Sequence, residues 1–289
     1  MRYGIVIPAF NEQDYLEEMI ESIANQDLMP EILVLVNDAS DDNTGEIAEE
    51  CARKYAWIKV IHREGKSGYA IGSKIIETFM VGLNTVDWKK WDVISKLDAD
   101  QIMPPNYFSS VIRLFEEHAD VGICGGVYTL RKNGKLTEER HTDHFHVRGG
   151  LKSWRKTCFE SIGGIRTEYG FDTLDELLAS YHGWRTVVIP ELKVELRRPT
   201  GTLIGTYKMH AKAGNMFYRI GYDPFIGLIS SIKRIFIKPY FLSTIYAYAA
   251  YLMACLKGES RMVTPDQARF IRQLRYKRMI NKLMGKVRS

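Results

Sequence analysis

Two aspartates separated by a single residue, Asp98 and Asp100, are the first feature of this sequence that points to chemistry. They directly follow residues 93–97, a short run with β-branched residues that is expected to form a strand. Carboxylates at this spacing coordinate Mg²⁺ or Mn²⁺, and such an ion bridges the oxygens of a diphosphate. The same spacing also occurs by chance in solvated loops, so the surrounding segments decide what the pair means.

The first hundred residues alternate short β-branched runs with amphipathic helical patterns, which predicts a mostly parallel sheet with helices on its faces. Strands are expected at residues 4–7, 32–36, 58–61 and 93–97. Between the first two strands, apolar side chains recur at the spacing of one buried helix face: Leu16, Met19, Ile20 and Ile23. Further helices are expected after Asn43 and over residues 67–83.

A polar segment follows each of the four predicted strands. These segments are residues 8–12, 37–42, 62–66 and 98–100. Ligands of open α/β sheets bind at the carboxyl ends of the strands, so the four segments are expected to build one cleft. This convergence is a stronger signal than the aspartate pair alone.

Together, four elements resemble family 2 glycosyltransferases of the GT-A fold over roughly residues 3–215. They are the segments at 6–12 and 36–44, the pair Gly65-Lys66, and Asp98-Ala99-Asp100. The resemblance implies an α/β, Rossmann-like, mostly parallel sheet flanked by helices. It also implies metal-dependent transfer of a sugar, with inversion, from a nucleotide-diphosphate donor to a lipid-linked or polysaccharide acceptor.

The resemblance assigns roles to residues at the predicted strand ends. The implied nucleotide-binding residues are Pro8, Ala9, Asn11, Glu12, Asp38, Lys66 and Asp98. Asp98 and Asp100 are expected to hold the cofactor, Mg²⁺ or Mn²⁺. One departure is Asn37, which stands where the family commonly has an aspartate and leaves the identity of the nucleotide base open.

Sugar transfer also needs a base for the acceptor hydroxyl, placed across the sugar from the diphosphate. The acidic stretch at residues 171–177 resembles the motif that holds the family's base, and its candidates are Asp172, Asp175 and Glu176. Counting back from Gly183 favours Asp172, whereas the local Asp-Glu pair favours Asp175, with Glu176 third. Alternatively, these residues are acidic because a helix dipole favours acidic side chains in the first turn.

Residues 148–155 resemble the family's acceptor-side segment, with Trp154 and Arg155 as the candidate acceptor residues. Trp154 could stack on a sugar ring, although a buried tryptophan beside ordinary turn glycines is an equal alternative. A zinc site at His141, His144 and His146 is disfavoured, because no fourth ligand follows at a suitable spacing. The basic pair at residues 197–198 could contact phosphates.

The composition changes near the C-terminus, so we expect a GT-A domain over residues 1–215 and a helical, basic, membrane-associating tail over 216–289. Residues 239–256 carry no charge and are bracketed by Lys238 and Lys257. A bilayer span needs about 20 apolar residues, so a helix in the membrane interface, one short membrane segment and a buried helix all remain open. We expect the protein at the cytoplasmic face of the cell membrane.

Charge and cysteine content narrow the partners. The formal net charge of +5 reflects 40 Lys and Arg against 35 Asp and Glu, and the excess lies mainly in the C-terminal quarter, which favours an anionic membrane surface. No nucleic-acid-binding module is recognisable, so no nucleic-acid partner is expected. The four cysteines form no close pair and the N-terminus resembles no signal peptide, as in a cytoplasmic protein.

Two other functions compete with the transferase. A nucleotidyltransferase would need a Gly-rich basic loop after the first strand, where residues 8–12 lack it. A catalytically silent nucleotide- or glycan-binding membrane protein, assisting a partner transferase, would have no need of an intact set of carboxylates. The motif of processive polysaccharide synthases and their multi-span tail are missing, which favours an enzyme that adds a single sugar.

Overall fold

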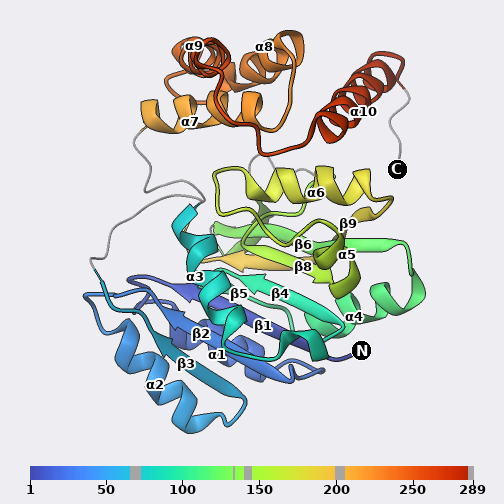
Figure 1. The fold of residues 1–289 in the computed structure, drawn as a ribbon. Coiled ribbons are helices and arrows are strands. Elements are labelled where there is room, and N and C mark those ends of the chain that lie inside the picture. The colour runs from blue at the N-terminus through green and yellow to red at the C-terminus, as the bar shows by residue number, and fades with distance from the viewer. Residues whose placement is uncertain (66–72, 133, 140–144, 199–205, 286–289) are drawn as a thin grey trace. The chain divides into compact units, whose positions relative to one another are not determined.

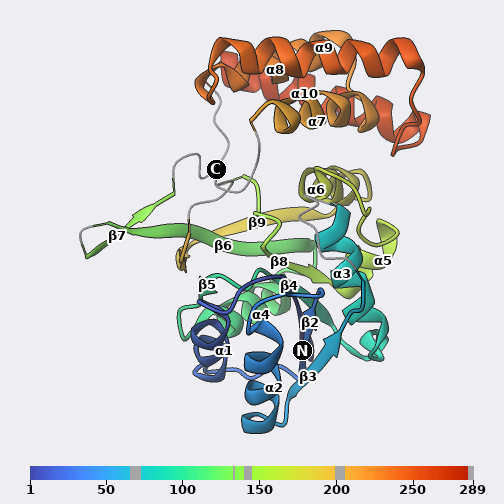
Figure 2. The ribbon, with the colours of Figure 1, turned by 90° about the vertical axis from the view of Figure 1, so that its left-hand side faces the viewer.

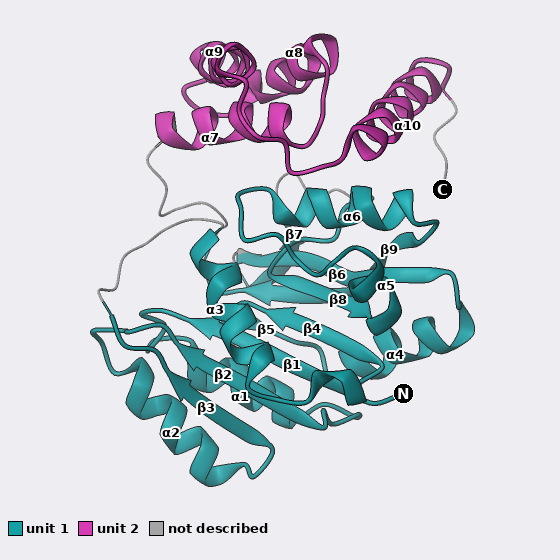
Figure 3. Cartoon of the chain, viewed as in Figure 1, with its two compact units in different colours: residues 1–202 teal, residues 203–289 magenta. Residues whose placement is uncertain are grey.

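The computed structural model describes residues 1–65, 73–132, 134–139, 145–198 and 206–285. The chain divides into two compact units, residues 1–202 and 203–289 (Figure 3), which are described separately below. The division leaves α7 (Thr206–Arg219) wholly in the second unit, whereas the boundary expected at residue 215 falls inside this helix.

The first unit is built around a nine-stranded mixed sheet (Figure 1). Its strands are β1 (Tyr3–Ala9), β2 (Ile32–Asn37), β3 (Ile58–His62), β4 (Val93–Leu97), β5 (Gln101–Ile102), β6 (Val121–Lys132), β7 (Lys135–Glu138), β8 (Leu151–Arg155) and β9 (Arg185–Leu196). The order is β3-β2-β1-β4-β8-β6-β9-β5, with β7 paired to β6. Strands β1 to β4 are parallel to one another, which confirms the α/β sheet expected for the first hundred residues.

Helices cover both faces of this sheet (Figure 2). They are α1 (Leu16–Ala24), α2 (Thr44–Lys54), α3 (Ser73–Asn84), α4 (Tyr107–Glu117), α5 (Lys156–Ser161) and α6 (Phe171–Tyr181), with the short 3-10 helix η1 (Trp88–Lys90). Part of the third predicted helix, residues 67–72, lies outside the described residues.

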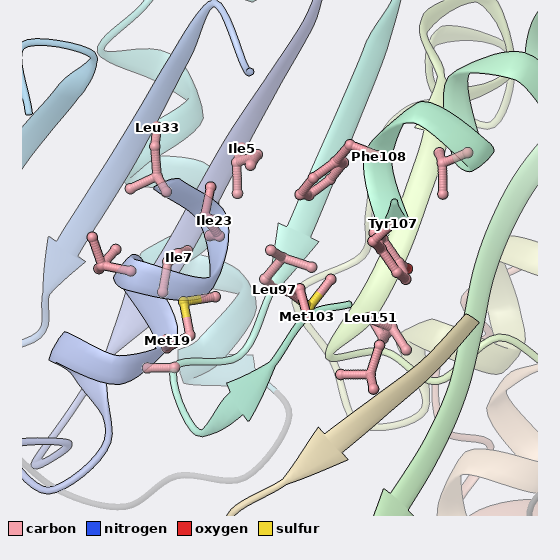
Figure 4. Close-up of a cluster of buried hydrophobic side chains, with 14 of the residues drawn as sticks. Ile5, Ile7, Met19, Ile23, Leu33, Leu97, Met103, Tyr107, Phe108 and Leu151 are labelled. Atoms are coloured by element: carbon pink, nitrogen blue, oxygen red, sulfur yellow. The ribbon is translucent and has the colours of Figure 1, made fainter. Parts of the chain in front are cut away.

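The two faces of β1 pack against different helices because side chains alternate along a strand. Ile5 and Ile7 lie in one core cluster with Met19 and Ile23 of α1 (Figure 4), as the helical spacing predicted. On the opposite face, α3 comes so close that a Cβ at Gly82 would lie 2.7 Å from the Val6 side chain. The central strands are therefore buried on both faces.

The second unit consists of α7, α8 (Pro224–Ile232), the 3-10 helix η2 (Lys233–Phe236), α9 (Phe241–Lys257) and α10 (Pro265–Leu283). One side of α9 packs inside this unit through Ser243, Ala247, Tyr251 and Ala254, all buried. Within the described ranges, no helix combines the length and the apolar character that crossing a bilayer requires.

Candidate active site

The segments that follow β1 and β2 are bonded to each other at the carboxyl edge of the sheet. The parallel register places Ala9 beside Asn37. Beyond the strands, Asn11 Nδ2 donates to Asp41 Oδ1 at 2.6 Å, and Asn11 Oδ1 accepts from the Asp41 backbone N–H at 3.1 Å. Asn11 has a φ of 54°, a left-handed conformation that asparagine tolerates better than most residues. The predicted nucleotide-binding residues at the ends of these two strands and just beyond them are brought together here: Pro8, Ala9, Asn11, Glu12 and Asp38.

Asp38 lies between two basic side chains. Arg63 Nη1 is 2.8 Å from its Oδ1, and Lys74 Nζ is 3.3 Å from its Oδ2. Lys74 also lies over the Phe10 ring, 5.4 Å from the ring centroid. Lys66, the predicted basic contact, lies outside the described residues.

Asn37 is held by bonds within the protein. Its Nδ2 is 3.1 Å from His62 Nδ1, and its Oδ1 accepts from the Ser40 backbone N–H at 3.2 Å. His62 Nε2 in turn lies 2.8 Å from Glu49 Oε1. The residue that departs from the family pattern thus supports the loop after β2.

Three carboxylates, Glu12, Asp98 and Asp100, lie near one another beyond the ends of β1 and β4, together with two basic side chains. Lys96 Nζ donates to Asp98 Oδ1 at 2.6 Å; Arg198 Nε donates to Asp100 Oδ2 at 2.7 Å, and Arg198 also bonds Glu12. Burial raises the pKa of Glu12 to about 7, against the opposing effect of Arg198. Burial and the nearby Asp98 raise the pKa of Asp100. The carboxylates exceed the cations by one charge when all are ionised.

This cluster is suited to a hard divalent cation. Buried Glu12 Oε2 has no hydrogen-bond partner among the described residues. Within those residues, no three His, Cys, Asp or Glu side chains form a ready-made metal site. Mg²⁺ is commonly held by one or two carboxylates, with water and substrate phosphates completing its shell, and Asp98 with Asp100 fits that pattern.

Two consecutive glycines before β8 bring this cluster close to the acidic helix α6. A Cβ at Gly150 would lie 2.0 Å from Asp98 Oδ2, and a Cβ at Gly149 would lie 3.1 Å from Asp172 Cβ. Any side chain at either position would collide with its neighbour. The predicted metal-binding and base segments, more than 70 residues apart in sequence, therefore meet at this dipeptide.

Asp175, one of the two leading candidates for the base, is enclosed by the protein. Its side chain is 2% exposed; Lys152 Nζ donates to Oδ1 and Trp154 Nε1 donates to Oδ2, each at 2.9 Å. Burial raises the pKa of Asp175 to about 7, a value that would suit a general base. However, both oxygens are already engaged by the protein, so this carboxylate is not accessible to an acceptor.

Asp172 is the more accessible acidic side chain, with 29% of its surface exposed against 13% for Glu176. His146 stands between them, with Nε2 3.4 Å from Asp172 Oδ2 and Nδ1 3.0 Å from Glu176 Oε2. Burial alone would raise the pKa of Asp172, but His146, Lys152 and Arg148 together outweigh burial and keep the pKa below its ordinary value. Asp172 therefore stays ionised at neutral pH.

The predicted acceptor residues Trp154 and Arg155 both make contacts within the protein. Trp154 is completely buried, bonded to Asp175 and packed edge-on against Phe159 of α5. The Arg155 guanidinium donates to the backbone carbonyls of Val121 at 2.9 Å and His118 at 2.9 Å. The Trp154 side chain is therefore not accessible to a sugar, whereas Arg155 is half-buried. The zinc alternative gains no support from His146, which faces two carboxylates, and His141 and His144 lie outside the described residues.

Sequence reasoning missed the two lysines beneath the site. Lys96 and Lys152 lie opposite each other in the antiparallel β4–β8 pair and are 1% and 0% exposed. Burial alone would lower the pKa of Lys152, but Asp175 and Glu176 outweigh it and raise the pKa to about 12. A lysine inside a predicted strand of the sheet, as in residues 93–97, was the available signal.

Comparisons with known proteins identify the family of this chain. Residues 4–168 match the family described as "Glycosyl transferase family 2". The uncharacterized glycosyltransferase YibD of Escherichia coli is 23% identical over 315 residues, covering 100% of this chain and 88% of the relative. Dolichol-phosphate mannosyltransferase of Pyrococcus furiosus is 35% identical over 138 residues, covering 47% of this chain and only 35% of that protein.

Among solved structures, a mannosyltransferase of Pyrobaculum calidifontis in complex with GDP-Man and Mn²⁺ shares the fold. The TM-score is 0.58 at 14% identity, with 97% of this chain and 80% of that chain covered. Fold and site thus define an α/β enzyme of the GT-A type. The chain belongs to glycosyltransferase family 2 and is a glycosyltransferase.

Proposed function

We propose that this enzyme transfers a sugar from a nucleotide-diphosphate donor to a lipid-linked or polysaccharide acceptor, with inversion and with a divalent metal ion. The observation that carries the proposal is the meeting of two carboxylate groups at Gly149-Gly150, with Asp98 against one glycine and Asp172 against the other. Transfer in a single displacement needs the leaving group and the base on opposite sides of one sugar. Asp98 and Asp172 belong to different clusters and both side chains are partly exposed, which suits that arrangement.

On the donor side, the nucleotide would lie along the loops after β1 and β2, with Asp38 toward the base or ribose. Asp98 and Asp100 would hold the ion, which when bound would neutralise charge on the departing diphosphate. Lys96 keeps Asp98 in place from below, and Arg198 supplies a positive charge beside Glu12 and Asp100. Mn²⁺ and GDP-Man in the Pyrobaculum enzyme support this part of the proposal.

On the acceptor side, we assign the base to Asp172. Its carboxylate is ionised and partly exposed, so it can accept the proton of an acceptor hydroxyl as the new bond forms. Asp175 would hold α6 on β8 instead. The name of the Pyrococcus relative, a dolichol-phosphate mannosyltransferase, supports a lipid-linked acceptor.

A membrane role for the second unit is supported by the outward side of α9. Seven apolar residues there are exposed: Phe241, Leu242, Ile245, Tyr246, Leu252, Met253 and Leu256. At 3.6 residues per turn they fall on one side of the helix, opposite its buried side. Lys238 and Lys257 flank this face. We propose that α9 lies in the interface of an anionic membrane on its cytoplasmic side, and the four free cysteine thiols agree with a reducing compartment.

The test is calorimetric titration of the full chain with UDP, GDP, dTDP and CDP, with and without Mn²⁺. Asp98→Asn is the critical variant, because an amide oxygen can still accept from Lys96; Asp87→Asn, an exposed site with the same charge change, is the control. We expect Mn²⁺-dependent binding of one diphosphate, lost in Asp98→Asn and kept in Asp87→Asn.

Turnover separates the enzyme from the silent binding protein. Asp172→Asn should bind the diphosphate normally but lose at least about a hundredfold in turnover of the sugar nucleotide, the usual scale for a missing base. If no nucleotide binds the wild type with or without Mn²⁺, the proposal fails. If the wild type binds one diphosphate but turns over none of the sugar nucleotides that carry the same base, the result would favour the catalytically silent protein.

A further inference from the structure

His146 occupies a position that the transfer scheme leaves unexplained. It lies between β7 and β8, and its ring bridges two carboxylates of α6, four residues apart in sequence. Nδ1 is 3.0 Å from Glu176 Oε2, and Nε2 is 3.4 Å from Asp172 Oδ2. The next residue continues the contact, since the Val147 backbone N–H donates to Glu176 Oε1 at 2.9 Å.

The geometry fixes the protonation state of this ring. A neutral imidazole carries one N–H, so one of the two carboxylates would face a ring lone pair. Both contacts are favourable only when both nitrogens are protonated. Burial alone would lower the pKa of His146, but the bonds to Asp172 and Glu176 outweigh burial and raise it to about 9.

The other charged groups around this cluster have different partners. Lys152 of β8 contacts the carboxylates of Asp175 and Glu176, but meets Asp172 at its backbone carbonyl, 2.7 Å away. Arg148 is paired with Glu139 at 2.9 Å. His146, by contrast, contacts the Asp172 carboxylate itself.

We propose that His146, as an imidazolium, is a positioning residue of the transfer reaction: it fixes the Asp172 carboxylate at Gly149 by bridging it to Glu176. This inference rests on the proposed role of Asp172 as the base. Because Asp172 remains ionised, the bridge breaks on the alkaline side, when the imidazolium loses its proton. The carboxylate can then turn away, and misplacement of a reacting group by about 1 Å can cost about a hundredfold in rate.

The experiment is the pH profile of kcat from pH 6 to 10 for the full-length wild type, His146→Gln and His182→Gln, with the donor Kd measured in parallel. His182 is an exposed histidine at the other end of α6 and serves as the control. We expect the wild-type kcat to fall above about pH 9. In His146→Gln, kcat at pH 7 should drop about tenfold to a hundredfold, the alkaline decline should vanish, and the donor Kd should stay unchanged.

A wild-type kcat at pH 7 in His146→Gln, or an alkaline decline that persists in this variant, would overturn the inference. A purely structural histidine would lower the melting temperature but leave the shape of the profile unchanged. If His146→Gln does not fold, Glu176→Gln serves instead. This variant removes one of the two carboxylates that contact His146, so the pKa of His146 should fall and the alkaline decline of kcat should begin at lower pH. Wild-type turnover by Asp172→Asn would refute the proposed role of Asp172 as the base. If Asp172→Asn is inactive but His146→Gln behaves like the wild type, only the inference about His146 is refuted.

Discussion

Replacing the buried Lys152 by methionine tests the argument that α6 is held on the sheet by charge. The substitution keeps most of the side-chain volume but removes the cation that lies 2.9 Å from Asp175 and 3.2 Å from Glu176. Breaking a buried ion pair by removing one partner costs about 3–5 kcal/mol, because the remaining charge is left without compensation. Lys152 is completely buried and faces two carboxylates, so we expect a loss within this range at pH 8.

Lys96→Met is the matched comparison. Lys96 lies directly opposite Lys152 in the β4–β8 pair and is equally buried, but its partner Asp98 keeps 41% of its side chain exposed. Water can therefore solvate Asp98 after the lysine is removed. We expect Lys96→Met to cost about 1.5–3 kcal/mol, the scale of a hydrogen bond to a charged group, and to weaken Mn²⁺-dependent nucleotide binding.

Urea unfolding of the full chain, followed by tryptophan fluorescence and fitted separately for the transition of the first unit, measures both losses. The deficit of Lys152→Met should shrink from pH 8 to pH 5. Without the lysine, the buried carboxylates have raised pKa values in the folded state, so they bind protons there first and folding is favoured as pH falls. This account would be refuted if the free energy of unfolding of Lys152→Met lay within about 0.5 kcal/mol of the wild-type value, which is the scale of ordinary surface substitutions. It would also be refuted if Lys96→Met lost more stability than Lys152→Met.

Four further outcomes are expected. Gly150→Ala should weaken Mn²⁺-dependent diphosphate binding about tenfold or more in calorimetry, because its Cβ would lie 2.0 Å from Asp98 Oδ2 and displace that carboxylate. Trp154→Phe should lower the free energy of unfolding by about 1.5–3 kcal/mol, because the bond to the Asp175 carboxylate is lost, and turnover should be retained. A variant of unchanged stability that no longer binds the acceptor would contradict this prediction. The stabilisation that the wild type gains from protonated His146 should be complete below about pH 6.5 and lost as pH rises through about 9, which His146→Gln should abolish in unfolding scans. Leu252→Glu should reduce co-sedimentation with anionic lipid vesicles without changing nucleotide binding, since it places a negative charge on the exposed face of α9.

The parallel half of the fold was predictable because its signals are local. Each predicted strand is a short run rich in β-branched residues, and α1 buries the four residues that its spacing indicated. The polar segments after the strands converge because parallel strands end at the same edge, which topology alone requires. The antiparallel half carries no such pattern: β8 pairs with β4, about 55 residues earlier, and only tertiary contacts set that register.

The choice between Asp172 and Asp175 could not be made from the sequence. The two aspartates lie three residues apart on one helix, close to one turn, so helical periodicity places both toward the sheet. The burial of Asp175 depends on Lys152 and Trp154, two residues apart on β8 and therefore on the same face. Trp154 was ambiguous for a related reason, since its indole N–H finds a partner equally well in a sugar or in a buried carboxylate.

The uncharged stretch at residues 239–256 was ambiguous because α9 is apolar on two sides. One side packs against its own unit, where a Cβ at Gly227 would lie 2.9 Å from the Tyr251 ring, and the other is exposed. A helix with two apolar sides has no polar stripe, so hydrophobic periodicity cannot separate a buried helix from an interfacial one. The structure separates the sides by burial, and the vesicle experiment addresses the exposed one.

The strand pair β4–β8 links the two halves of the proposed reaction. Lys96 and Lys152 are directly paired across these strands, and each reaches a different carboxylate group: Lys96 bonds Asp98, and Lys152 bonds Asp175 of α6. Strand spacing is set by backbone hydrogen bonds at about 4.8 Å, so the two anchors cannot drift apart without breaking the sheet. Sites built on such elements hold their geometry more tightly than sites built on loops. The sheet therefore governs the distance between Asp98, which is proposed to hold the metal ion, and the helix that carries the proposed base. The proposed role of His146 is to orient the Asp172 carboxylate on that helix.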